Sequence, residues 1–125
     1  MNLVLQPPGS NKCGQACVAM VAGVTLKQSL KAYGLQHATT LYATRNALKK
    51  LGFTPAEKLQ AFGKKESKLP ETCLLMLRWP KRNLGHWVVY HDGQVYDPAG
   101  YIDTWEVFLV LHGTASLKYL ELHSV

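Results

Sequence analysis

The pattern of apolar and polar positions changes between the two halves of the chain. In the first half, small and apolar residues fill positions 13–24, directly after a segment of helix breakers, PPGSN. Such a run predicts a buried helix that begins close to Cys13. Two more helices are predicted, one from Thr25 to position 33 and one from Thr39 or Thr40 to position 51, because threonine is a good N-cap and a glycine follows each segment.

The second half has the patterns of strands. An Asp-Gly pair at 92–93 separates two apolar runs, and this is a strong hairpin signal. Segment 104–111 has the pattern of either a short helix or a strand. The expected strands are 72–79, 86–90, 94–96 and a closing strand at 116–122, and 63–70 is expected to be a surface turn. Helices followed by an antiparallel sheet predict an α+β fold packed in two layers.

Length and composition favour one domain over residues 1–125. The chain has 125 residues, of which 47% are hydrophobic, enough for one core. It has no apolar run of membrane-spanning length, and its N-terminus lacks the features of a signal peptide. Three cysteines are an odd number and a low density, so thiol chemistry or core packing in a reducing cytoplasm is expected rather than a disulfide scaffold.

Cys13 is the candidate nucleophile. At the start of a helix, free backbone N–H groups and the helix dipole lower the pKa of a thiol and can also stabilise an oxyanion. Of the five histidines, His86 is the best partner, because it opens a strand and Gly85 before it would allow a close backbone approach. Asp97 lies on the returning strand of the hairpin, where its carboxylate can hold the imidazole in one tautomer.

These residues stand in three stretches that resemble a known family. The stretches are Gln6 with the CGQACVAM segment from Cys13, GHWVVY around His86, and VYDP around Asp97. Together they resemble the papain-like peptidase domains of bacteriocin-processing ABC transporters, which cleave double-glycine leader peptides, and their stand-alone relatives. The sequence differs from the usual pattern in having Lys12 where an aspartate is common, and one additional residue between Gln6 and Cys13.

The resemblance implies a papain-like fold and a cysteine peptidase without a cofactor. Cys13 would be the nucleophile, His86 the base and Asp97 its orienter, while Gln6 would complete the oxyanion hole. The substrate would be a peptide or protein. The same chemistry would also suit a glutamine deamidase or transglutaminase, and a non-catalytic peptide-binding domain is a further alternative.

Other residues have simpler interpretations. Cys17 and Cys73 are expected in the core, and a zinc site is disfavoured because paired metal ligands are missing. Trp87 and His91 are weaker candidates for substrate contact. Trp87 should face away from His86 by strand alternation, and His91 should lie near the hairpin turn. His37 is expected in a surface loop.

The formal net charge of +6 favours acidic partners. The basic pairs 49–50, 64–65 and 81–82 are expected to be solvated surface, with a patch for an acidic partner as the alternative. Nucleic acid is disfavoured as a partner, because the three tryptophans are not interleaved with lysine or arginine.

Overall fold

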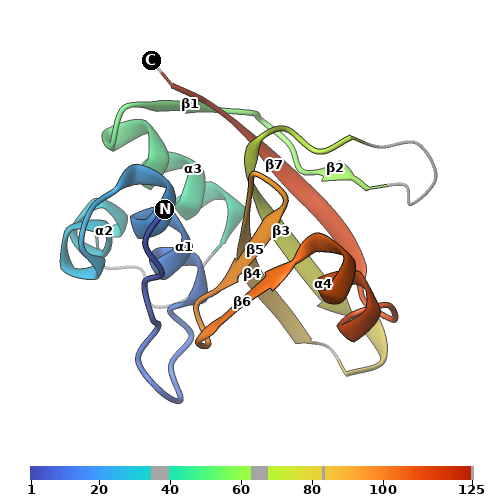
Figure 1. Ribbon diagram of the computed structural model, residues 1–125. Helices are drawn as coiled ribbons and strands as arrows, with labels where there is room; N and C mark the ends of the chain where they lie inside the picture. Colours follow the sequence, from blue (N-terminus) through green and yellow to red (C-terminus); the bar gives the residue numbers. More distant parts are fainter. Residues whose placement is uncertain (35–39, 63–67, 83, 125) are drawn as a thin grey trace.

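Three helices make up the N-terminal part of the protein. The computed structural model describes residues 1–34, 40–62, 68–82 and 84–124. The helices are α1 (Cys13–Ala22), α2 (Leu26–Tyr33) and α3 (Leu41–Lys50) (Figure 1). None of the described helices is long and apolar enough to cross a membrane.

Local sequence signals set the ends of these helices. At α2, the Thr25 side chain accepts a hydrogen bond from the Gln28 N–H at 3.1 Å, and the Gln28 side chain accepts one from the Thr25 N–H at 2.8 Å. This capping box satisfies two N–H groups that the helix leaves free. Thr40 caps α3 in the same way, so the predicted starts of both helices are confirmed. The end of α1 comes two residues earlier than predicted, because Gly23 adopts a left-handed φ of 67°.

An antiparallel sheet makes up most of the remaining chain. Its strand order is β1-β7-β3-β4-β5-β6, and β2 also pairs with β7. The strands are β1 (Phe53–Pro55), β2 (Gln60–Ala61), β3 (Thr72–Trp79), β4 (Leu84–His91), β5 (Gln94–Asp97), β6 (Tyr101–Thr104) and β7 (Ser116–Ser124). A short 3-10 helix, η1 (Pro80–Arg82), precedes β4, and helix α4 (Trp105–Leu111) precedes β7.

The strand predictions are confirmed for β3, β4, β5 and β7. Asp92 and Gly93 have φ angles of 48° and 81°, as a two-residue hairpin turn of the primed type requires. Segment 104–111 is a helix, capped by the Thr104 side chain. The strands β1, β2 and β6 were not predicted, and the closing strand β7 lies between β1 and β3. Residues 63–67 of the predicted surface turn lie outside the described residues.

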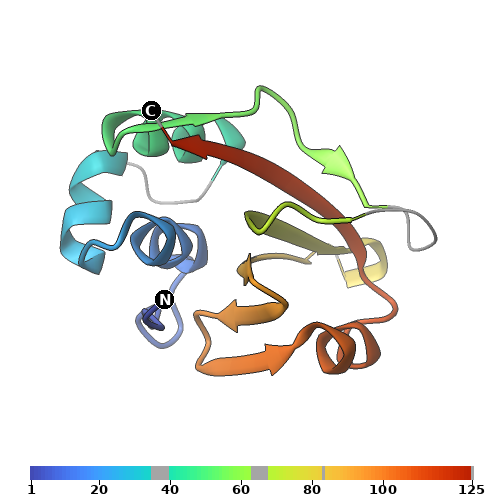
Figure 2. The ribbon, with the colours of Figure 1, turned by 45° about the horizontal axis from the view of Figure 1, so that its top comes forward.

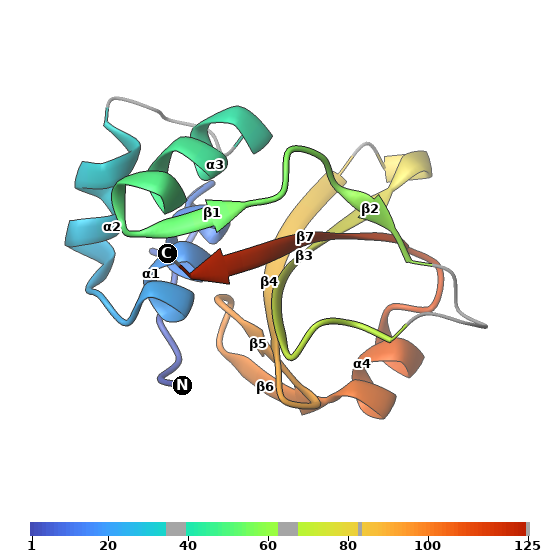
Figure 3. The ribbon, with the colours of Figure 1, turned by 90° about the horizontal axis from the view of Figure 1, so that it is seen from above.

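Each face of the sheet buries its own core. Alternation along β3 sends Leu74 toward α1, α2 and α3, whereas Leu75 and Leu77 face α4. The same alternation separates Trp87, which packs with the three helices, from Val88. Figures 2 and 3 show the three helices gathered on one side of the sheet and α4 at the other end of the molecule. The prediction of two layers is therefore incomplete, because α4 covers part of the second face.

Candidate active site

Cys13 is held at the contact between α1 and the sheet. It is the first residue of α1, and residues 14–20 of this helix are all buried. Helix α1 packs against β4, the strand that carries His86. Cys13 itself is half-buried, so its thiol is both fixed by packing and partly open to solvent.

His86 and Asp97 come together through the β4–β5 hairpin. Val89 pairs with Tyr96 in the hairpin. If this register continues, Asp97 lies diagonally across from His86 on the same face of the sheet. The His86 Nε2 and Asp97 Oδ1 atoms are 2.7 Å apart. The two side chains are 23% and 14% exposed, so water screens this contact only in part.

The Asp97 carboxylate is oriented by its own turn. Its Oδ1 accepts a hydrogen bond from the Ala99 N–H at 2.9 Å, and its carbonyl accepts one from the Gly100 N–H at 2.9 Å. This is an Asx turn, which an Asp-Pro-Ala-Gly sequence favours. The role of the Ala99 N–H was not predicted, although this local sequence signal was available.

Cys13 and His86 interact, and each shifts the pKa of the other. Since His86 Nε2 is bound to Asp97, the other ring nitrogen, Nδ1, is left for the thiol. Burial raises the pKa of the Cys13 thiol, but the hydrogen bond to His86, the backbone N–H groups of Trp87 and Gly14 and the charge of His86 outweigh it and bring the pKa below 9.0. The Trp87 and Gly14 donors were not predicted as parts of the site.

The imidazole is correspondingly biased toward its charged form. Burial lowers the pKa of His86, but hydrogen bonds to Asp97 and Cys13 and their negative charges raise it to about 9. Burial also raises the pKa of Asp97, and the hydrogen bonds from His86 and from the Ala99 N–H more than compensate, so the pKa of this carboxyl is lowered. Together these shifts favour a thiolate beside an imidazolium over the neutral pair.

Gln6 lies at the same end of the sheet, next to the residue that follows Asp97. Its backbone N–H donates to the Pro98 carbonyl at 2.9 Å. Its side-chain Nε2 donates to the Ser10 carbonyl at 3.0 Å, which leaves this nitrogen a second N–H. Gln6 Oε1 is buried and has no hydrogen-bond partner among the described residues.

A tight turn sets the direction of the Gln6 amide. The Ser10 N–H donates to the Pro7 carbonyl at 3.1 Å, and Gly9 has a φ of 69°. Proline followed by a glycine at positive φ is the signature of a type II turn. This turn presents the Ser10 carbonyl to Gln6, and so the proline-rich segment of the sequence orients a candidate oxyanion-hole side chain.

A cavity of about 470 Å³ lies beside these residues. It opens between two loops, the proline-rich turn on one side and the segment after Asp97 on the other. Most of its lining is apolar, and Gln6 is the polar side chain in it. The lining residues are Leu5, Gln6, Pro7, Pro8, Gly9, Pro98 and Ala99.

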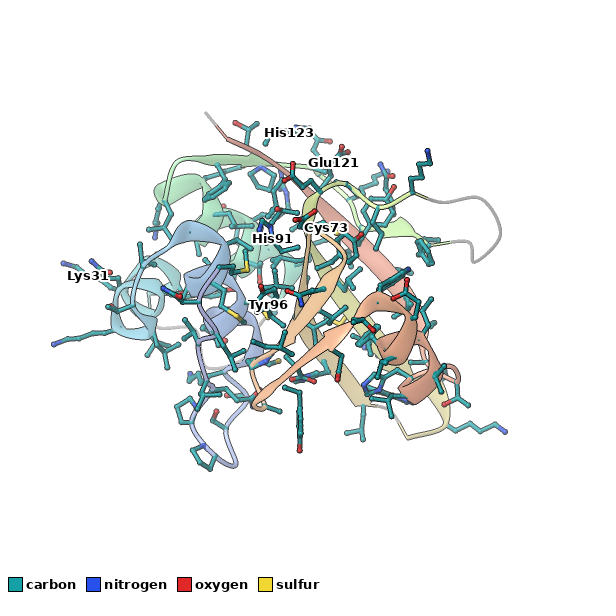
Figure 4. All side chains as sticks on the ribbon, in the orientation of Figure 1. Lys31, Cys73, His91, Tyr96, Glu121 and His123 are labelled. Atoms are coloured by element: carbon teal, nitrogen blue, oxygen red, sulfur yellow. The ribbon has the colours of Figure 1, made fainter. Side chains whose placement is uncertain are left out.

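The weaker candidates for substrate contact lie in different places. The Trp87 side chain is only 2% exposed and packs in the helix-side core, which leaves its backbone N–H to face Cys13. His91 is half-buried, and its Nδ1 is 2.6 Å from Thr72 Oγ1. At the opposite end of β4, it is about 17 Å along the strand from His86, close to Tyr96 (Figure 4).

The remaining sequence candidates are mainly structural. Cys17 and Cys73 are fully buried, and burial raises the pKa of both, that of Cys73 to about 12. Gly85 is not required by a close approach, because a Cβ there would make only ordinary contacts at 3.6 Å or more. His37 lies outside the described residues. Within the described ranges, no cluster of three or more His, Cys, Asp or Glu side chains is placed to hold a metal ion.

Solved structures of known proteins share this fold. The chain matches the peptidase domain of Streptococcus ComA, a bi-functional ABC transporter involved in a quorum sensing pathway, with a TM-score of 0.65 and 20% identity. It matches the peptidase domain of Streptococcus mutans ComA with a TM-score of 0.62 and 21% identity, and the complex of that domain with a small-molecule inhibitor with 0.53 and 22%. Each match covers 98% of both chains.

The comparisons define the class of fold. No family model matches the sequence, and a search of curated proteins finds no significant match. The structural matches show that the chain has the papain-like α+β fold of a cysteine peptidase domain, with N-terminal helices packed on an antiparallel sheet. The resemblance to bacteriocin-processing peptidase domains is thus confirmed at the level of the fold.

Proposed function

We propose that this protein is a cysteine peptidase that hydrolyses peptide or isopeptide bonds. The observation that carries the proposal is the chain of contacts from Asp97 through His86 to Cys13, together with the lowered pKa of the thiol. A nucleophile, a base and an orienting carboxylate in this arrangement form the catalytic unit of papain-like hydrolases.

In the proposed reaction the Cys13 thiolate attacks the scissile carbonyl carbon. The bond to the leaving nitrogen breaks, and the His86 imidazolium gives its proton to that nitrogen. Water, deprotonated by His86, then attacks the thioester and releases Cys13. Asp97 keeps the imidazole in the orientation that both steps need, since it holds Nε2 and leaves Nδ1 toward the sulfur.

The oxyanion formed in each step needs donors. The backbone N–H of Cys13 lies at the free N-terminus of α1, where N–H groups have no partner within the helix. The second Nε2 hydrogen of Gln6 would supply another donor, and the Pro7–Ser10 turn restricts the rotation of that amide. Removing one such donor from a hydrolase typically slows catalysis by about 100- to 1,000-fold.

The expected substrate and setting follow from the same resemblance. ComA is a transporter with a peptidase domain, so a leader-like segment of a peptide or protein is the first substrate class to test. Cys13, Cys17 and Cys73 are free thiols, which suits a reducing cytoplasm. We propose that residues 1–125 act as one catalytic domain there and that no cofactor takes part.

The test is a peptide library incubated with wild type, with Cys13→Ala and with Cys73→Ala as a matched control. Cys73 is buried away from the site, so its variant should retain the activity of wild type while Cys13→Ala loses it. Mass spectrometry of the products distinguishes a cleaved backbone from a deamidated or cross-linked glutamine. If glutamine is modified and no peptide is cleaved, the protein is a deamidase or transglutaminase and not a peptidase. If no peptide gives any product, the result favours a non-catalytic peptide-binding domain.

A further inference from the structure

Acidic residues are unevenly distributed along the chain. The first 56 residues contain six lysines and arginines and no aspartate or glutamate. The other 69 residues contain eight residues of each sign, so the whole net charge of +6 belongs to the segment that forms α1, α2 and α3. None of these three helices has an acidic residue in its first turn, where the helix dipole would favour one.

Four lysines of this segment are exposed on α2 and α3, and we name them together the lysine face: Lys27, Lys31, Lys49 and Lys50. Lys27 and Lys31 are one turn apart on α2, and Figure 4 shows Lys31 on the outer side of that helix, away from the sheet. Lys50 at the end of α3 donates from Nζ to the Ala32 carbonyl at 3.1 Å, which joins the C-terminal ends of α2 and α3. Lys31, Lys49 and Lys50 therefore belong to the last turns of two neighbouring helices, and Lys27 lies one turn before Lys31.

No carboxylate neutralises this surface within the described ranges. Neither ion pair there involves a lysine, since they join His86 to Asp97 and His123 to Glu121. The lysine face thus presents several like charges that no described carboxylate pairs with, and such a surface attracts an oppositely charged partner.

The composition of the lysine face selects among anionic partners. A nucleic-acid surface would combine arginine forks with stacking aromatic rings. Here Arg45 is half-buried and donates to the Ala56 carbonyl at 2.8 Å, and Tyr42 is the strongly exposed aromatic residue of the described helices. A membrane-binding surface would also need a set of exposed large apolar side chains. Flexible lysines without either feature fit the carboxylates of a peptide.

The lysine face also belongs to the same helical layer as the candidate active site. The Ser29 hydroxyl of α2 donates to the Gln15 carbonyl of α1 at 2.7 Å, two residues from Cys13. We propose that the lysine face binds an acidic segment of the polypeptide substrate, remote from the bond that Cys13 attacks. This inference rests on the proposed peptidase function and adds a substrate class to it.

The test measures binding in the Cys13→Ala background, so that it does not depend on catalysis. The probes are a fluorescein-labelled peptide of alternating glutamate and serine, its glutamine counterpart, an oligothymidylate of similar length and phosphatidylglycerol vesicles. The helix variant is Lys27→Glu, Lys31→Glu and Lys49→Glu together. The matched control is Lys68→Glu, Lys81→Glu and Lys118→Glu, three exposed lysines outside the helical layer with the same change in net charge.

We expect the glutamate peptide to bind, and the helix variant to weaken its binding by about tenfold, against less than about twofold for the control. Raising the salt from about 25 mM to about 300 mM should remove most of the difference, because screening shortens the range of these charges. Equal losses in both variants would show that net charge alone acts and would overturn the proposal. The proposal would also be overturned if the glutamate peptide did not bind. It would be overturned too if binding depended on the lysine face only for the oligothymidylate or the vesicles.

The two proposals fail in different experiments. If Cys13 cleaves no peptide in the library and yet the glutamate peptide binds through the lysine face, the peptidase function is wrong and the face serves an acidic peptide ligand. If cleavage depends on Cys13 and the helix variant binds the glutamate peptide as well as the control does, the proposed role of the lysine face is wrong. The proposed peptidase function is then unaffected.

Discussion

Replacing His86 by alanine should make Cys13 an ordinary buried thiol. In wild type, burial opposes the thiolate and His86 is the largest of the groups that favour it. Without the imidazole, burial remains, and only the Trp87 and Gly14 N–H groups act against it. The pKa of Cys13 should therefore move from below 9.0 to above 9.0.

The size of the effect on alkylation follows from this change. A thiol with a pKa near 9 is a thiolate in about one molecule in a thousand at pH 6. Each unit by which the pKa rises lowers the thiolate fraction tenfold, but the more basic thiolate is also more nucleophilic, which leaves a net loss of about threefold per unit. Alkylation of Cys13 at pH 6 should therefore be slower in His86→Ala than in wild type, by about threefold for each unit of this rise.

The assay is the rate of iodoacetamide alkylation from pH 5 to pH 10, measured site by site by mass spectrometry. Cys17 and Cys73 are internal controls, because both are fully buried and have raised pKa values. The wild-type profile for Cys13 should contain a second step near pH 9, where His86 loses its proton. A single step at or above pH 9, unchanged in His86→Ala, would refute the ion pair and with it the proposed mechanism.

Other predictions test the parts of the site and of the core separately. Asp97→Asn should lower the pKa of His86 from about 9 toward 6.5 in an NMR titration of the imidazole, and an unchanged value would contradict the role given to the carboxylate. Gly9→Ala should strain the turn that holds Gln6 by about 1 kcal/mol or more and lower kcat more than it changes KM, whereas Gly9→Asn should retain most of the activity. Folding stability should fall between pH 6.5 and 9 by less than His86 alone would cause. The raised pKa of His86 gives stability that is lost as pH rises toward about 9, whereas the lowered pKa of Cys13 gives stability that grows with pH up to 9.0 and offsets part of this loss. Denaturant unfolding of Cys13→Ala should then show stability falling over this range, by at most about 1.4 kcal/mol per pH unit, and a flat profile would contradict the pairing. Leu120→Ala, at a fully buried position, should lower the free energy of unfolding by about 2–5 kcal/mol, and a loss below about 1 kcal/mol would mean that β7 is not central to the core.

The helices were predictable because their ends are encoded locally. Thr25, Thr40 and Gly34 act through hydrogen bonds or backbone angles within a few residues, and such signals can be read without knowledge of the fold. The β4–β5 hairpin was predictable for the same reason, since Asp92-Gly93 specifies the turn and the turn fixes the register. That register brings Asp97 to His86, and so this pair could be expected from sequence.

The short strands depend on partners far away in the sequence. Strand β1 contains Pro55, which weakens a strand signal, and it pairs with the last residues of β7. Strand β6 has four residues and follows a turn-forming segment after Asp97, so its pattern is too short to recognise. These elements form because neighbouring strands offer free N–H and C=O groups, which a local pattern cannot reveal.

The surroundings of Gln6 and Cys13 were only partly predictable. The breaker-rich segment indicated a turn, but the bond from Gln6 Nε2 to the Ser10 carbonyl depends on the left-handed conformation of Gly9. The Trp87 and Gly14 donors are backbone groups, which carry no residue-specific signal at all. Gly85 shows the reverse case, because its residue type suggested a close approach that the structure does not need.

The helical layer contains no carboxylates, and this affects both the thiolate at the start of α1 and the charge of the protein surface. A thiolate at the start of α1 gains about 0.3–1 kcal/mol from the helix dipole, and an acidic residue in the first turn would oppose this gain. No lysine is among the groups that shift the pKa of Cys13, in contrast to His86, and solvent ions screen exposed charges over a Debye length of about 8–10 Å. The field of the lysine face is strongest at the surface, where a substrate first meets the protein. In the two proposals together, the local contacts generate the nucleophile, while the charge of the layer governs which peptides approach it.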